Sequence, residues 1–213
     1  MRTEELLRAL TADGVRPVVP IRRTLAAALL TGTLLSVLVF GLLLHPRPDI
    51  AQAIYTGPFV FKLIVCALLA GTAAALLSDT ARPRPRFRRY WSGLLASAPL
   101  LLGIGVIVEL TRMPAHTWTA RLIGHNAAHC LFLIPMLSLA PAGCVLVGLR
   151  NGAPIQPALA GAIAGLVSGG VAAALYALSC PDDSPLFVAT WYSIAIAAVT
   201  AASSYAGRHV LRW

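Results

Sequence analysis

Two cysteines, Cys130 and Cys180, are the residues of this sequence best placed to do chemistry, because each stands at the border of a long apolar segment. Paired thiols close a disulfide when their α-carbons come within about 7 Å. Thiolates, alone or with imidazole, also bind soft or borderline metals such as zinc and cadmium. The candidate accessory ligands beside the two thiols are His125, His129, Asp182 and Asp183. A structural disulfide, a metal site and two unrelated free thiols are all open at this point.

The two other cysteines, Cys66 and Cys144, fall inside apolar segments, where a thiol usually behaves as a small hydrophobic side chain. The sequence contains no CxxC, GxSxG or HExxH motif and no phosphate-binding glycine loop. We therefore expect no enzymatic activity and no required cofactor. A transient heavy-metal ion or a disulfide at Cys130 and Cys180 is the chemistry that the sequence supports.

Six long apolar segments must position these thiols. The chain is 58% hydrophobic and 12% charged, and about 20 apolar residues cross the hydrocarbon core as a helix. Because a helix satisfies its own backbone hydrogen bonds in lipid, the sequence predicts an all-α membrane protein with six transmembrane helices in a compact bundle. The expected spans, within a membrane domain of residues 24–206, are 24–44, 59–78, 91–110, 130–149, 158–178 and 187–206.

The positive charges are distributed unevenly along this pattern. Of the 17 Lys and Arg residues, all but four lie before the first span, after the last, or in the 79–90 and 150–157 loops; the four are Arg47, Lys62, Arg112 and Arg121. By the positive-inside rule both termini, including the tail 207–213, are expected in the cytoplasm and both border cysteines outside. The net charge of +9 then reflects arginines beside anionic membrane lipids, with no direct binding of nucleic acid.

Small residues dominate the spans. Gly161, Gly165 and Gly169 recur at four-residue spacing and so share one helical face. Such a face lets another backbone approach closely, and we expect a tight bundle or a homodimer through it. Lys62 and Glu109 lie near span ends, from which their side chains are expected to reach the membrane interface. The lack of midplane charges argues against a transporter.

Residues 1–23 form the largest expected soluble segment. The stretch from Thr3 to Leu10 is typical of a short helix, with Leu6, Leu7 and Leu10 on one side and Arg8 beside them. A helix this short is marginal alone in water, so its leucines need a surface to cover them. The membrane interface and a soluble protein partner are both open.

Two stretches resemble a known family. Residues 129–135, continuing through 149–154, are similar to the fourth helix and following loop of the NrsF-type negative regulators of sigma-F. Residues 176–192 are similar to an outer loop and the sixth helix of the same family. The similarity extends over the whole chain and is most specific in 129–192.

The resemblance implies an anti-sigma factor of the bacterial inner membrane whose residues 1–23 hold an extracytoplasmic-function sigma factor. It also implies that Cys130 and Cys180 face outward and sense heavy-metal or oxidative stress. We hypothesise that Leu6, Leu7, Arg8 and Leu10 contact the sigma factor, and that a reaction at the thiols releases it. The alternatives are a small membrane transporter or metal exporter, and a structural subunit of a membrane complex.

Overall fold

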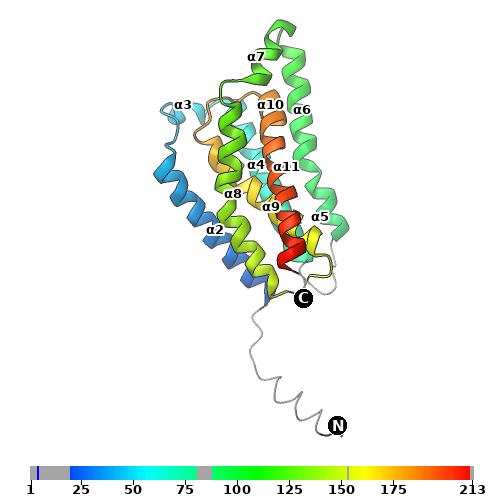
Figure 1. The fold of residues 1–213 in the computed structure, drawn as a ribbon. Helices are drawn as coiled ribbons and strands as arrows, with labels where there is room; N and C mark the ends of the chain where they lie inside the picture. The colour runs from blue at the N-terminus through cyan, green and yellow to red at the C-terminus, as the bar shows by residue number, and fades with distance from the viewer. Residues whose placement is uncertain (1–3, 5–19, 81–87, 153, 212–213) are drawn as a thin grey trace.

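The computed structural model describes residues 4, 20–80, 88–152 and 154–211. Within these residues the regular structure is helical and no strand occurs. Six helices are long and apolar enough to cross a membrane (Figure 1). Their bounds are Ile21–Leu43, Gly57–Asp79, Ser92–Arg112, Ala127–Arg150, Pro157–Ala177 and Pro185–Val210. The predicted all-α bundle of six spanning helices is confirmed.

The spans alternate in direction, so their connections collect at two ends of the bundle (Figure 1). The elements are α2 (Ile21–Leu43), α3 (Ile50–Ala53), α4 (Gly57–Thr80), α5 (Arg88–Leu95), α6 (Ser97–Arg112), α7 (Trp118–Ile123), α8 (Ala127–Arg150), α9 (Pro157–Ala177), α10 (Pro185–Phe187) and α11 (Ser193–Val210). We call the end formed by residues 44–56, 113–126 and 178–184 the thiol end. The other, where α2 begins and α11 stops, is the terminal end.

Two spans are irregular. The third breaks between α5 and α6 at Ala96, where Pro99 has no N–H to donate to the carbonyl four residues earlier. The sixth contains a π turn, η2 (Val188–Tyr192), between α10 and α11. A π turn shifts the face on which the following side chains lie. The expected spans 91–110 and 187–206 contained neither interruption.

Helix α9 forms the centre of the bundle and packs against α11, α4 and α8. Its glycine face meets α11 of the same chain. A β-carbon added at Gly161 would lie 2.4 Å from the carbonyl oxygen of Ser203, and one added at Gly165 would lie 2.7 Å from the Ser203 β-carbon. One added at Gly169 would lie 3.2 Å from Ile196. The close backbone approach expected from these glycines therefore occurs inside one bundle.

Helices α2 and α8 are joined by a second close contact. Pro141 has no N–H, so the carbonyl of Leu137, one turn earlier in α8, loses its helical donor. The Ser36 hydroxyl of α2 donates to that carbonyl at 2.6 Å. A β-carbon added at Gly32 would lie 2.4 Å from the α-carbon of Pro141. The proline that removes a helical hydrogen bond from α8 is therefore matched by a glycine and a serine on the facing side of α2.

Candidate functional site

Cys130 and Cys180 meet at the thiol end. Cys130 lies in the first turn of α8, and Cys180 follows α9 in a stretch without regular structure. Both are free thiols. The Cys130 thiol hydrogen-bonds to the Cys180 sulfur, and the Tyr176 hydroxyl hydrogen-bonds to Cys130. Two residues fifty positions apart thereby form one site.

Both thiols are enclosed by protein. Cys130 is 0% exposed and Cys180 is 1% exposed, so both side chains point into the core at this end of the bundle. Their cluster includes Tyr176, Phe187 and Tyr192, whose rings pack with centroids 5.9 Å apart for the two tyrosines and 6.3 Å apart for Phe187 and Tyr192. The polar sequence around the cysteines belongs to the loop surface, while the sulfur atoms face the helices.

The pKa of the Cys180 thiol is lowered from its ordinary value. The largest cause is the hydrogen bond from Cys130; the positive charge of Lys62 acts in the same direction, and both oppose the effect of burial. A thiolate rather than a thiol is the nucleophile and the metal ligand. Cys180 is therefore the chemically more reactive member of the pair.

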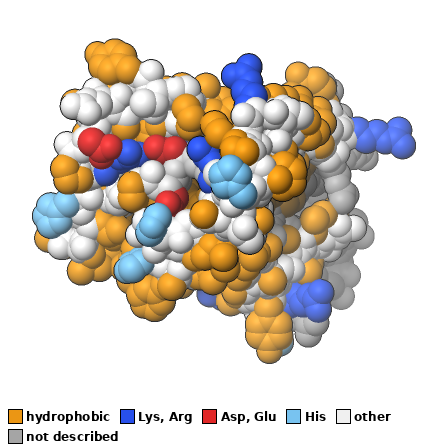
Figure 2. All heavy atoms as spheres, turned by 90° about the horizontal axis from the view of Figure 1, so that it is seen from above, with side chains coloured by type: hydrophobic (Ala, Val, Ile, Leu, Met, Phe, Trp, Pro, Cys, Tyr) orange, Lys and Arg blue, Asp and Glu red, His pale blue; other side chains and the backbone are white. Residues whose placement is uncertain are grey.

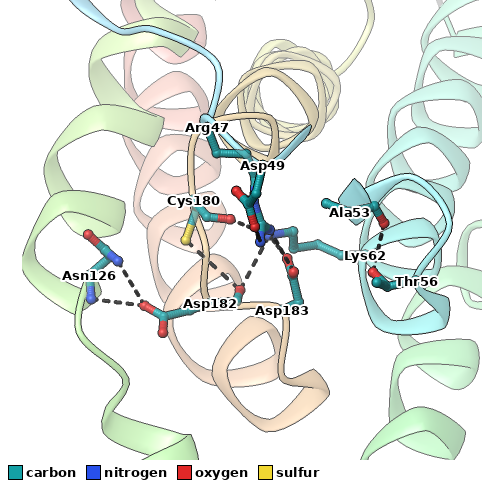
Figure 3. A network of polar contacts seen from close by, with 9 residues as sticks. All are labelled: Arg47, Asp49, Ala53, Thr56, Lys62, Asn126, Cys180, Asp182 and Asp183. Atoms are coloured by element: carbon teal, nitrogen blue, oxygen red, sulfur yellow. Dashed lines mark hydrogen bonds and ion pairs between the residues drawn. The ribbon is translucent and has the colours of Figure 1, made fainter. Parts of the chain in front are cut away.

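An ion-pair network holds the loop that carries Cys180 (Figure 3). Asp183 lies 2.5 Å from Lys62 and 2.7 Å from Arg47, and Arg47 also binds Asp49 through two 2.7 Å contacts. These contacts raise the pKa of Arg47 and lower that of Asp49, chiefly through the hydrogen bonds between the two. Lys62 is fully buried. The expectation that the Lys62 side chain reaches the membrane interface is wrong, because its ammonium is enclosed by contacts with residues of the Cys180 loop.

Glu109 was also expected to reach the membrane interface, and its side chain is buried instead. Its side chain is 5% exposed and lies 2.7 Å from Arg121. Its carboxylate also accepts hydrogen bonds from the Ser184 hydroxyl at 2.8 and 2.9 Å and from the Leu186 amide at 2.9 Å. The carboxylate thus ties α6 to the start of α10. Seen from above, the thiol end carries intermingled acidic and basic side chains (Figure 2).

The four candidate accessory ligands do not gather around the thiols. The Asp182 carboxylate accepts hydrogen bonds from the backbone amides of His125 and Asn126 at 3.1 and 3.0 Å, where it lies at the start of α8. The His125 ring, 95% exposed, is 3.7 Å from that carboxylate, and His129 is exposed on α8. Asp183 belongs to the ion-pair network. Among the described residues no group of three or more His, Cys, Asp or Glu side chains is arranged to hold a metal ion.

A cleft of about 680 Å³ leads from the surface of the thiol end toward the Cys180 loop. It opens between the start of α4, the end of α6 and residues 181–185, and its lining includes Arg112, Arg121, Asp182 and Asp183. The cleft brings the solvent to the loop while the thiol itself stays covered.

Several residues of this site were not predicted as such. Lys62, Tyr176 and Tyr192 lie within apolar segments, where the sequence offers no pattern that sets them apart. One signal was present: Lys62 precedes Cys66 by four residues, which places both on one face of α4. Cys66 is buried in the same core cluster as the thiol pair, whereas Cys144 is half-buried. The proposed sigma-binding residues Leu6, Leu7, Arg8 and Leu10 lie outside the described residues.

Comparison with known proteins identifies relatives along the full chain. Residues 10–213 match the family NrsF, described as negative regulator of sigma F. The chain is 36% identical over 217 residues to the anti-sigma-F factor NrsF of Caulobacter vibrioides, and the alignment covers 100% of both chains. It is 31% identical over 217 residues, again with 100% of both chains covered, to the probable anti-sigma-F factor NrsF of Azospira oryzae. No solved structure matches the chain.

Proposed function

Because the chain belongs to the NrsF family of negative regulators of sigma F, we propose that it is a membrane anti-sigma factor. In this proposal it holds an extracytoplasmic-function sigma factor at the bacterial inner membrane. The uneven distribution of Lys and Arg supports an orientation with both termini in the cytoplasm and the thiol end outside. The protein then acts by binding and release, without catalysis.

The input of this regulator is the pair Cys130 and Cys180. The observation that carries the proposal is that the two cysteines lie in one buried cluster, which joins α8 to the loop after α9. A soft metal dication displaces one proton from each thiol and forms two metal–sulfur bonds. A peroxide instead oxidises one thiol to a sulfenic acid, which condenses with the second thiol to a disulfide and releases water. Either product changes the distance between the two elements.

The contact between α2 and α8 supports a route from this input to the cytoplasm. Cys130 lies at the start of α8, and the Ser36 bond to Leu137 ties that helix to α2 two turns further along. Helix α2 begins at Ile21, inside the segment 1–23 that is proposed to bind the sigma factor. A displacement of α8 at its thiol end therefore shifts α2 as well, since Gly32 and Pro141 leave no free space between them.

The output is proposed to be the amino-terminal segment 1–23. Leu6, Leu7 and Leu10 would bury their side chains on the sigma factor, with Arg8 pairing to an acidic group. Releasing the partner tenfold more readily requires about 1.4 kcal/mol of differential binding energy. One new disulfide or one pair of metal–thiolate bonds supplies more than that.

Thiol substitution in cells tests the input. A sigma-dependent reporter is measured with and without cadmium or peroxide for Cys130→Ser, for Cys180→Ser and for the matched control Cys144→Ser. Induction is expected to disappear in the first two variants and to persist in the control. Unchanged induction in a Cys130→Ser/Cys180→Ser double variant would exclude the thiol pair as the sensor.

Co-purification tests the output. The full-length chain in detergent is expected to retain a sigma factor, and Leu6→Asp with Leu10→Asp is expected to abolish that retention while the melting temperature is unchanged. A variant that binds as well as the parent rules out the leucine surface. Cellular cadmium content is measured in parallel. A metal exporter would lower the cadmium content of the cells, whereas an anti-sigma factor would not.

A further inference from the structure

Lys62 of α4 contacts the thiol loop at three points (Figure 3). Its ammonium donates to the backbone carbonyl of Cys180 at 2.9 Å and to that of Asp182 at 3.3 Å. It also lies 2.5 Å from Oδ1 of Asp183, an ion pair without the geometry of a hydrogen bond. The side chain is 0% exposed. Its described hydrogen bonds and ion pair are all made with residues 180–183.

Such an arrangement is costly for the fold. Removing an ammonium from water costs several kcal/mol, and a buried ion pair commonly stabilises no more than apolar side chains of the same size. Asp183 also has a second cation, because Arg47 lies 2.7 Å from its other carboxylate oxygen. Neutralising Asp183 therefore does not require Lys62. What Lys62 adds among the described residues is the pair of bonds to carbonyls on either side of Pro181.

The segment that receives these bonds has no regular structure from Cys180 to Ser184. Its side chains point to different neighbours: Asp182 binds the start of α8, and Ser184 binds Glu109 of α6. Neither contact fixes the backbone at Cys180 itself. The Cys180 amide donates to the Tyr176 carbonyl at 3.1 Å, and Lys62 holds the carbonyl of the same residue. Helix α4 in turn packs along α9, which gives the ammonium a rigid support.

We propose that Lys62 is the positioning residue of the thiol site: by holding the carbonyls of Cys180 and Asp182, it keeps the Cys180 sulfur against Cys130. The inference rests on the proposed thiol function and adds a residue to it. It also gives α4 a part in the response, because any reaction that moves Cys180 must stretch or break bonds to this helix.

Thiol cross-linking in the purified full-length protein measures the positioning. Diamide takes two electrons and two protons from the thiols, so that one sulfur–sulfur bond forms and the diamide becomes a hydrazine. The rate of formation of the Cys130–Cys180 disulfide is followed by peptide mass spectrometry. A misplacement of reacting atoms by about 1 Å can slow a reaction by up to about a hundredfold, and we expect at least about a tenfold lower rate in Lys62→Met.

Three further variants separate positioning from general destabilisation. Lys62→Arg keeps the charge and the donors and is expected to restore most of the rate. His116→Met removes an exposed polar side chain at the same end, outside the lining of the cleft, and is expected to leave the rate unchanged. Lys62→Met/Asp183→Asn removes both partners of the ion pair, so it folds without an unpaired buried charge, and is expected to be as slow as Lys62→Met.

A parental rate in the folded double variant overturns the proposal, as does equal slowing by His116→Met. Failure of the parent chain to form this disulfide contradicts the thiol contact on which the inference depends. The assay contains no sigma factor, so its outcome is independent of the reporter experiment. If cross-linking requires Lys62 but the reporter does not respond to the cysteines, the positioning role stands and the sensor role falls.

Discussion

The two ends of the bundle are held together in opposite ways. At the thiol end, buried charged side chains form ion pairs, as Lys62 does with Asp183 and Glu109 with the partly exposed Arg121. At the terminal end, α9 and α11 touch backbone to backbone, with Gly161 and Gly207 against each other. Ion pairs respond to protons, metals and oxidised neighbours, whereas a backbone contact has no chemical group that changes. The molecule thus places adjustable contacts where the thiols are and fixed contacts where the chain leaves the bundle.

The largest effect is expected at the fixed contact. Gly161→Ala places a β-carbon 2.4 Å from the Ser203 carbonyl oxygen, and overpacking of this kind costs about 3 kcal/mol. Thermal unfolding in detergent should show a large drop in melting temperature or no folded protein. Gly143→Ala is the control, because a β-carbon there has no neighbour within 4 Å. If the two variants are equally stable, the close contact between α9 and α11 is not a rigid support, and the two ends of the bundle do not differ in this way.

A smaller loss is expected at the adjustable contacts. Glu109→Ala leaves Arg121, the Ser184 hydroxyl and the Leu186 amide without their shared acceptor, which costs about 2 kcal/mol. The same unfolding experiment measures it, with Thr111→Ala as a control on the exposed side of α6. If Glu109→Ala destabilises more than Gly161→Ala, the ion pairs and not the glycines are the stronger support.

The smallest effect belongs to the exposed ion pair between Arg47 and Asp49. Because folding lowers the pKa of Asp49 below its ordinary value of 3.8, chiefly through its hydrogen bond to Arg47, this contact stabilises the fold above that pH and is lost as the pH falls below it. The parent chain should therefore exceed Asp49→Asn slightly in melting temperature near neutral pH. The difference should vanish in acid. A difference in melting temperature that grows on acidification would contradict a lowered pKa of Asp49 in the folded protein.

Hydropathy alone was sufficient to predict the six spans, since length and apolar composition are local properties. The thiol contact was predicted only as an expectation from the resemblance and from the position of Cys130 and Cys180 at segment borders. The burial of both sulfurs was not predicted, because which way a border residue faces depends on the packing of α8 against α9. The roles of Lys62 and Glu109 were missed for a similar reason. The partners of Lys62, and the Ser184 and Leu186 partners of Glu109, are more than seventy residues away, and no local pattern reports such contacts.

The central position of α9 has a consequence for how the protein is made. A membrane protein is synthesised from its amino terminus, and its earlier parts emerge first. Four spans therefore enter the membrane before α9, against which α4 and α8 pack, has been made. The fifth and sixth spans, which are separated by residues 178–184, then complete the bundle. Completion of the bundle, and with it the contact between Cys130 and Cys180, depends on the last third of the chain.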